Sequence, residues 1–279
     1  MPYADITDGC LYYEEYGRGE PLLLIPGLGG VGSFWNRQID RLSDRFRVII
    51  HDHRGTGRSE TTTAEGYSIR LLADDVLALM DHLELQCAAI VGHSTGGVIG
   101  QTLAAFTPQR VSRLVLSSSW AKGDAYFDSL FGLRLEVLET AGIDAYERFG
   151  RLLRYAPTYF ETHPEALLPP ADGSSGTPEV IAARIRAILD FDSRNFLRDI
   201  VSPTLIIGAL DDAITPPHLW RALEQGIANS RRVELPYGGH FCPQSRHKDY
   251  NRHLLEFLNA CATGDTITSH RRCSHVEED

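Results

Sequence analysis

Short apolar runs that alternate with amphipathic segments constrain the fold of this chain more than any other feature. Continuous apolar runs of this length are typical of parallel strands that are buried on both faces of a sheet. The pattern predicts strands over residues 10–16, 21–26, 46–52, 87–91, 113–118, 203–208 and 231–236.

Amphipathic segments separate several of these runs. Residues 68–83 carry apolar side chains at helical spacing, among them Ile69, Leu72 and Val76, and residues 250–261 repeat the pattern. Strands and helices that alternate in this way predict an α/β fold with a mostly parallel, doubly wound sheet.

Residues 120–200 interrupt the alternation with helical segments, one of which has Thr177 as N-cap and Pro178 in its first turn. We expect a helical lid or cap insertion over the carboxyl edge of the sheet, where open α/β sheets bind ligands. Residues 1–119 and 201–262 then form the core. Residues 168–178 are rich in Pro, Gly and Ser, and residues 263–279 are polar and without period, so both are predicted to be flexible.

The net charge of the chain limits the classes of partner that it is expected to bind. The formal net charge is −10, and no basic block offsets it, which argues against nucleic acid and against an anionic membrane surface. No apolar run approaches the ~18 residues that span a bilayer. The N-terminal residues resemble no signal peptide, and the five cysteines are scattered without a C-x-x-C pair. We therefore expect a cytoplasmic protein with a small-molecule substrate, and a homodimer stays open.

The segment "CAAIVGHSTGG" (87–97) carries the strongest chemical signal. A strand is followed by Gly92-His93-Ser94-Thr95-Gly96 and then by a helical stretch. G-x-S-x-G in this context predicts a nucleophile elbow, a sharp turn that exposes the serine hydroxyl at the sheet edge. The glycines are needed because Cβ atoms beside the turn would clash.

A serine hydroxyl needs a base to become a nucleophile at neutral pH. His240 stands in "LPYGGHFC", on a glycine-containing loop just after the last predicted strand, which places it at the same sheet edge as Ser94. His93 and His163 are weaker candidates, for contacts to the substrate rather than for the base.

The base in turn needs a carboxylate that orients it. In the chain order expected for this fold, the acid lies between the serine and the histidine, after a strand. Asp124, Asp211 and Asp212 meet these conditions, and spacing alone leaves all three open.

Two backbone amides must stabilise the oxyanion of acyl transfer. One is expected from Thr95, the residue after the serine. The other is expected from Leu28, because "PGLGG" (26–30) follows an early strand and its glycines permit close approach to a substrate.

With these motifs assembled, the sequence resembles the α/β-hydrolase family over nearly its whole length, from Leu11 to Ala262. The motifs that carry the resemblance are "PGLGG", "DHRGTGRS", "VGHSTGG", "GALDDAITP" and "YGGH". The family usually has His-Gly where this chain has Pro26-Gly27. Arg54, within "DHRGTGRS", is interpreted as structural, tying a tight turn.

The resemblance implies which aspartate is the acid. In the family's acid loop the aspartate precedes a proline by four residues, and Asp212 stands in that frame before Pro216. Asp211 is out of register by one residue. The resemblance therefore favours Ser94, His240 and Asp212 as a catalytic triad.

Two subgroups are the most similar, the 3-oxoadipate enol-lactone hydrolases and the aminoacrylate (carbamate-type) hydrolases. The resemblance implies a serine hydrolase without metal or cofactor that cleaves a small carboxylic ester, lactone or enol-lactone through an acyl-enzyme. Alternatives are amide or carbamate hydrolysis, C–C hydrolysis, and a receptor without turnover. Four aromatic residues at the start of the insertion are further candidates for substrate contacts: Trp120, Tyr126, Phe127 and Phe131.

Overall fold

The computed structural model describes residues 2–61, 63–169 and 176–260. Residues 263–279 and most of the segment 168–178, which were predicted to be flexible, lie outside the described residues. Within them, nine strands form one sheet. The strands are β1 (Tyr3–Ile6), β2 (Gly9–Tyr16), β3 (Glu20–Ile25), β4 (Phe46–His51), β5 (Glu60–Thr61), β6 (Ala88–His93), β7 (Val111–Ser117), β8 (Thr204–Ala209) and β9 (Ser230–Leu235).

The sheet has the order β1-β2-β4-β3-β6-β7-β8-β9, with β5 beside β2. All pairs from β4 to β9 along this order are parallel, whereas the pairs made by β2 are antiparallel. The prediction of a mostly parallel, doubly wound sheet is confirmed. The short strands β1 and β5 were not predicted.

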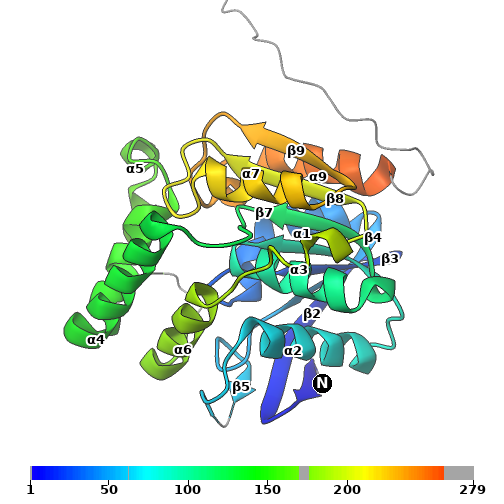
Figure 1. Ribbon diagram of the computed structural model, residues 1–279, viewed down its shortest axis with the longest axis horizontal. Helices are drawn as coiled ribbons and strands as arrows, with labels where there is room; N and C mark the ends of the chain where they lie inside the picture. The colour runs from blue at the N-terminus through cyan, green and yellow to red at the C-terminus, as the bar shows by residue number, and fades with distance from the viewer. Residues whose placement is uncertain (1, 62, 170–175, 261–279) are drawn as a thin grey trace, which may run out of the picture.

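Helices cover both faces of the sheet (Figure 1). The helices are α1 (Asn36–Ser43), α2 (Ile69–His82), α3 (Thr95–Phe106), α4 (Ala125–Arg154), α5 (Tyr159–Thr162), α6 (Pro178–Leu189), α7 (Pro217–Gly226), α8 (Cys242–Ser245) and α9 (His247–Ala260).

Strand β3 shows why both faces are apolar. Leu23 and Ile25 belong to the core under α2, α3 and α7, whereas Leu22 and Leu24 belong to the core under α1 and α9. Successive side chains of a strand point to opposite faces, so a continuous apolar run fills two cores at once.

The segment between β7 and β8 contributes α4, α5 and α6, which lie at one end of the sheet (Figure 1). Asp124 caps α4 by accepting a hydrogen bond from the Phe127 amide at 2.9 Å. Helix α4 is kinked at Gly142, whose φ of 81° no L side chain adopts readily. In the described part of the chain, no helix combines the length and the apolarity that crossing a bilayer requires.

Arg54 ties the turn after β4 to helix α2. Its Nε and Nη2 donate to the Asp75 carboxylate at 2.6 and 2.5 Å, and both side chains are buried. A bidentate pair of this kind fixes geometry as well as charge. These contacts agree with a structural role for Arg54.

Candidate active site

Ser94 occupies a strained turn between β6 and α3. Its φ of 54° and ψ of −116° lie in a region that residues with a side chain rarely adopt. A Cβ on Gly92 would lie 2.1 Å from the Gly96 carbonyl oxygen, and a Cβ on Gly96 would lie 2.2 Å from that of Ile25. Both glycines are therefore required by the closeness of the backbone around the serine.

His240 lies on the loop between β9 and α8, after two glycines with positive φ. Its Nδ1 is 2.9 Å from Oδ2 and 3.1 Å from Oδ1 of Asp212. A carboxylate only accepts hydrogen bonds, so Nδ1 carries the proton and donates it to this pair. Nε2 is then the basic nitrogen of the ring.

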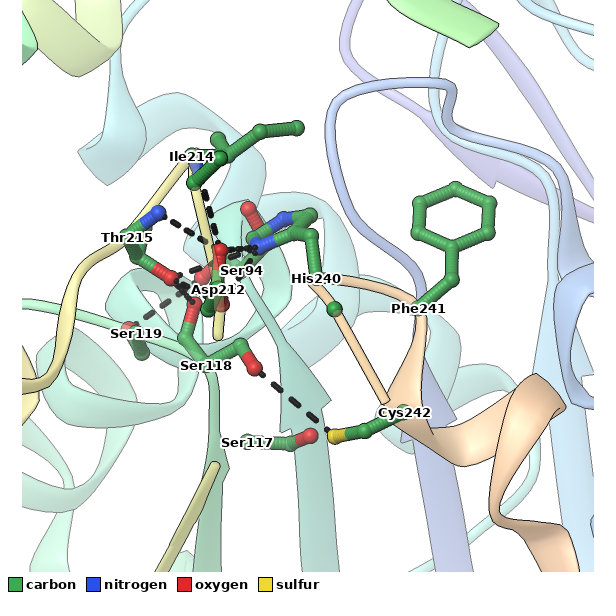
Figure 2. Close-up of polar contacts among 12 residues, drawn as sticks. Ser94, Ser117, Ser118, Ser119, Asp212, Ile214, Thr215, His240, Phe241 and Cys242 are labelled. Atoms are coloured by element: carbon green, nitrogen blue, oxygen red, sulfur yellow. Dashed lines mark hydrogen bonds and ion pairs between the residues drawn. The ribbon is translucent and has the colours of Figure 1, made fainter. Parts of the chain in front are cut away.

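Asp212 follows β8 and is buried, with 3% of its surface exposed. Its Oδ1 accepts hydrogen bonds from the amides of Ile214 and Thr215, both at 2.9 Å, and Thr215 Oγ1 lies 2.8 Å from its Oδ2 (Figure 2). These donors satisfy a charge that would otherwise be expensive to bury, and they fix the carboxylate against His240.

The other two candidate acids lie elsewhere. The Asp211 carboxylate accepts a hydrogen bond from the Gly239 amide at 2.8 Å, so it supports the loop that carries His240. Asp124 caps α4 and lies 2.7 Å from His218 Nε2 on an exposed surface. Of the three aspartates, the structure brings only Asp212 to His240.

Ser94 and His240 line one cavity of about 180 Å³. Leu28 lines it as well, and the Leu28 amide donates no hydrogen bond to any residue that the structure describes. Thr95 is the first residue of α3, where backbone amides lack acceptors within the helix. Both amides expected to bind an oxyanion are thus on segments that adjoin Ser94.

Of the six predicted substrate contacts, His93 and Phe131 line this cavity. The other four are not among its lining residues. Trp120 and Phe127 are fully buried and pack together, with ring centroids 4.8 Å apart. Tyr126 is exposed and its hydroxyl donates to the Ala213 carbonyl, whereas His163 stacks on Tyr159 outside the cavity.

The imidazole of His93 lines the cavity next to His240. It stacks on Phe34 at 4.7 Å between ring centroids and lies 4.8 Å from His240. Burial, followed by the neighbouring charge that His240 acquires when protonated, holds the pKa of His93 well below its usual range.

Arginines from α4 form the side of the cavity contributed by the insertion, and the sequence prediction missed them. Arg134 is 7% exposed and donates from Nη2 to the Tyr146 hydroxyl at 3.0 Å. Its Nε has no partner, and no carboxylate in the described part of the chain forms an ion pair with it. Arg154 also lines the cavity, with Nη2 at 3.4 Å from Glu147. The helical spacing could have indicated that Arg134 is buried, because it continues the buried face of α4 formed by Phe127, Phe131 and Leu138.

No group of three or more His, Cys, Asp or Glu side chains within the described ranges is arranged to hold a metal ion. The polar side chains that line the cavity are instead three hydroxyls, two imidazoles, the carboxylate of Glu147 and two guanidiniums. This set can perform nucleophilic and acid–base chemistry on its own.

The family model described as alpha/beta hydrolase fold matches residues 20–243. The chain belongs to this family. The predictions of the family, of the fold and of a hydrolase enzyme are confirmed, and the protein is an alpha/beta hydrolase.

Its relatives include the RutD proteins, which are named as candidate carbamate hydrolases. RutD of Azorhizobium caulinodans is 37% identical over 262 residues, covering 92% of this chain and 98% of its own length. RutD of Serratia proteamaculans is 36% identical over 256 residues, covering 89% and 96%.

Among solved structures, the enol-lactonase of Burkholderia xenovorans LB400 superposes with a TM-score of 0.85 at 30% identity, covering 92% of this chain and all of its own. A thermophilic esterase of Thermogutta terrifontis, solved with malate bound, has a TM-score of 0.83 at 27% identity, covering 92% and 97%. The hydrolase therefore has relatives with different named activities.

Proposed function

We propose that the hydrolase is a serine hydrolase whose triad is Ser94, His240 and Asp212. The observation that carries the proposal is the strained Ser94, which lines the same cavity as the buried His240–Asp212 pair. Strain of this kind persists where the surrounding structure holds a functional side chain in place.

In the proposed mechanism, Ser94 Oγ attacks the carbonyl carbon of the substrate while His240 Nε2 takes its proton. Asp212 stabilises the imidazolium that forms. The amides of Leu28 and Thr95 bind the oxyanion of the tetrahedral intermediate. His240 then protonates the leaving group, and a water molecule that it activates releases the acid from Ser94.

Ser94→Ala tests the mechanism, with 4-nitrophenyl acetate as substrate and a fluorophosphonate as active-site label. We expect labelling of the wild-type peptide that contains Ser94, no labelling of the variant, and a loss of about 10³-fold or more in kcat. Ser129→Ala, an exposed serine on α4, is the control and keeps full activity. Unchanged turnover by Ser94→Ala would show that the nucleophile is not this serine.

We further propose that the substrate is a small ester, lactone or enol-lactone that carries a carboxylate. Support comes from Arg134, a buried guanidinium on the cavity wall with an unpartnered Nε. No described carboxylate forms an ion pair with Arg134, and a substrate carboxylate would supply one. The enol-lactonase and the malate-bound esterase among the structural relatives point to the same range of ligands.

A pair of matched substrates tests this choice: the mono-4-nitrophenyl ester of adipic acid and its methyl ester, which is neutral. We expect the wild type to prefer the acid, and Arg134→Gln to lose about tenfold or more in kcat/KM for the acid alone, the scale of one charged hydrogen bond. Arg148→Gln, an exposed arginine on the same helix, serves as control. Equal losses for both substrates would refute a carboxylate contact.

Carbamate hydrolysis is the second candidate, because the RutD proteins are 36–37% identical over nearly the whole chain. The same triad would attack a carbamate carbonyl and expel either the amine or the alcohol, and water would then release the remaining carbonyl group from Ser94. Steady-state rates on matched ethyl esters and ethyl carbamates separate the two candidates.

A further inference from the structure

Arg184 is a buried cation without a carboxylate partner in the described part of the chain. It lies on α6, is 0% exposed, and forms no ion pair with any described residue. Its donors instead reach neutral oxygens, which are Leu28 O at 2.6 Å, Thr56 Oγ1 at 2.6 Å, Tyr67 Oη at 2.9 Å and Arg54 O at 3.3 Å.

A guanidinium is expensive to bury without a counter-charge, and an apolar side chain of similar size would pack at lower cost. A purely packing role therefore does not explain an arginine at this position. What the guanidinium supplies is a set of directed hydrogen bonds, and the shortest of them include the one to the Leu28 carbonyl.

Leu28 belongs to the loop of residues 26–30, which lines the cavity beside Ser94. Four carbonyls of this loop each accept a hydrogen bond. The contacts are His53 Nε2 to Pro26 O at 3.1 Å, Gly30 N to Gly27 O at 3.0 Å, Arg184 Nη1 to Leu28 O at 2.6 Å and His53 N to Gly30 O at 2.7 Å.

The loop contains Gly27, Gly29 and Gly30, whose backbones reach many conformations at little cost. A peptide of such a loop can rotate and turn its carbonyl oxygen into the cavity, where it would repel an oxyanion. At the Leu28 carbonyl, Arg184 is the described group that opposes this rotation, since its Nη1 holds the oxygen on the side of α6.

We propose that Arg184 is a positioning residue for catalysis: it holds the carbonyl oxygen of the Leu28–Gly29 peptide away from the cavity, so that this oxygen does not face the oxyanion bound by the Leu28 amide of the preceding peptide. The inference rests on the proposed function, because it assumes that Leu28 contributes to the oxyanion hole. On this proposal, a residue of α6, in the insertion, affects the rate of the reaction.

The test compares Arg184→Met and Arg184→Lys with Arg186→Met, an exposed arginine on the same helix that pairs with Glu139. The measurements are kcat and KM on 4-nitrophenyl acetate, and the affinity for an aryl trifluoromethyl ketone. Addition of a serine hydroxyl to this ketone forms a tetrahedral oxyanion. Circular dichroism and thermal unfolding establish that each variant is folded.

For folded Arg184→Met we expect kcat to fall by about tenfold to a hundredfold with KM changed less than about threefold, because the donor is disturbed rather than removed and outright removal costs about 10²–10³-fold. Affinity for the ketone falls by the same factor as kcat/KM, whereas affinity for acetate, the product, is unchanged. Arg184→Lys retains part of the rate, and Arg186→Met behaves as wild type.

A kcat within twofold of wild type in folded Arg184→Met overturns the proposal, as does a loss confined to KM. If Arg184→Met does not fold, Arg184→Lys decides: a loss of about fivefold or more in kcat at constant KM supports the proposal, and a smaller loss refutes it. Failure of the proposed function is recognised separately, because Ser94→Ala would then retain activity and the wild type would not bind the ketone covalently.

Discussion

Adjacent aspartates at the end of β8 have different partners. The carboxylate of Asp212 contacts the His240 ring, whereas that of Asp211 accepts the Gly239 amide. Both residues lie in the turn that follows β8, where the Asp212 amide donates to the Ala209 carbonyl at 3.3 Å, so a shift of one residue decides which carboxylate reaches the histidine.

Asp212→Asn should therefore lower kcat by about 10⁴-fold, since an amide cannot orient the imidazole or stabilise its charge in the same way. Asp211→Asn retains an acceptor for the Gly239 amide, and we expect a loss below tenfold. Steady-state kinetics at pH 7 measures both. A larger loss for Asp211→Asn than for Asp212→Asn would show that Asp212 is not the acid of the triad.

The sequence was informative about Asp212 because register is a local property. It was uninformative about the contact between Arg184 and Leu28, which are 156 residues apart in the chain. The aromatic candidates Trp120 and Phe127 illustrate the same limit: the pattern shows that they are apolar but not whether they face the cavity or the interior of the insertion.

At the scale of elements, the turn between β6 and α3 is the most crowded part of the site. A Cβ at Gly96 would lie 2.2 Å from the Ile25 carbonyl oxygen. Gly96 and Ile25 are both buried. The neighbouring strand β3 cannot move away, because it is paired with β4 and β6.

Gly96→Ala should accordingly reduce the yield of folded protein or lower the unfolding free energy by at least 3 kcal/mol or so, the scale of a severe steric clash. The control is Gly132→Ala on α4, where a Cβ meets nothing within 4 Å. That change should raise the unfolding free energy by about 0.5–1 kcal/mol, because alanine favours the helix. Urea unfolding compares them, and equal stabilities would contradict the crowding seen in the structure.

Local patterns predicted these elements well. Each strand of the parallel part was identified from its apolar run, and α2 and α9 from their helical spacing. The insertion could be identified as helical, but not arranged, since the kink at Gly142 and the packing of α4 on α6 depend on contacts between distant segments.

Buried histidines make the stability of the whole molecule depend on pH. Burial lowers the pKa of His51 to about 4 and holds that of His53 well below its usual range. In the unfolded chain both rings bind protons near pH 6.5. Because the unfolded state binds more protons between these values, stability is complete above about pH 6.5 and is lost as the pH falls toward 4.

His51→Phe should flatten this dependence. Each histidine that titrates only in the unfolded state contributes a slope of up to about 1.4 kcal/mol per pH unit, and the variant should lose one such contribution between pH 6.5 and 4.5. Urea unfolding at several pH values measures the slope. His82→Gln, at an exposed position, should leave it unchanged, and an unaltered slope in His51→Phe would show that His51 is protonated in the folded state.

The hydrogen bond from Arg184 to the Leu28 carbonyl joins helix α6 to the loop of residues 26–30. Exchanging the segment between β7 and β8 for that of another hydrolase would replace the cavity wall that contains Arg134. The same exchange would remove α6 and the donor to the Leu28 carbonyl. A transplanted insertion would have to bring its own donor to the Leu28 carbonyl, so under the two proposals above the exchange would alter specificity and turnover together.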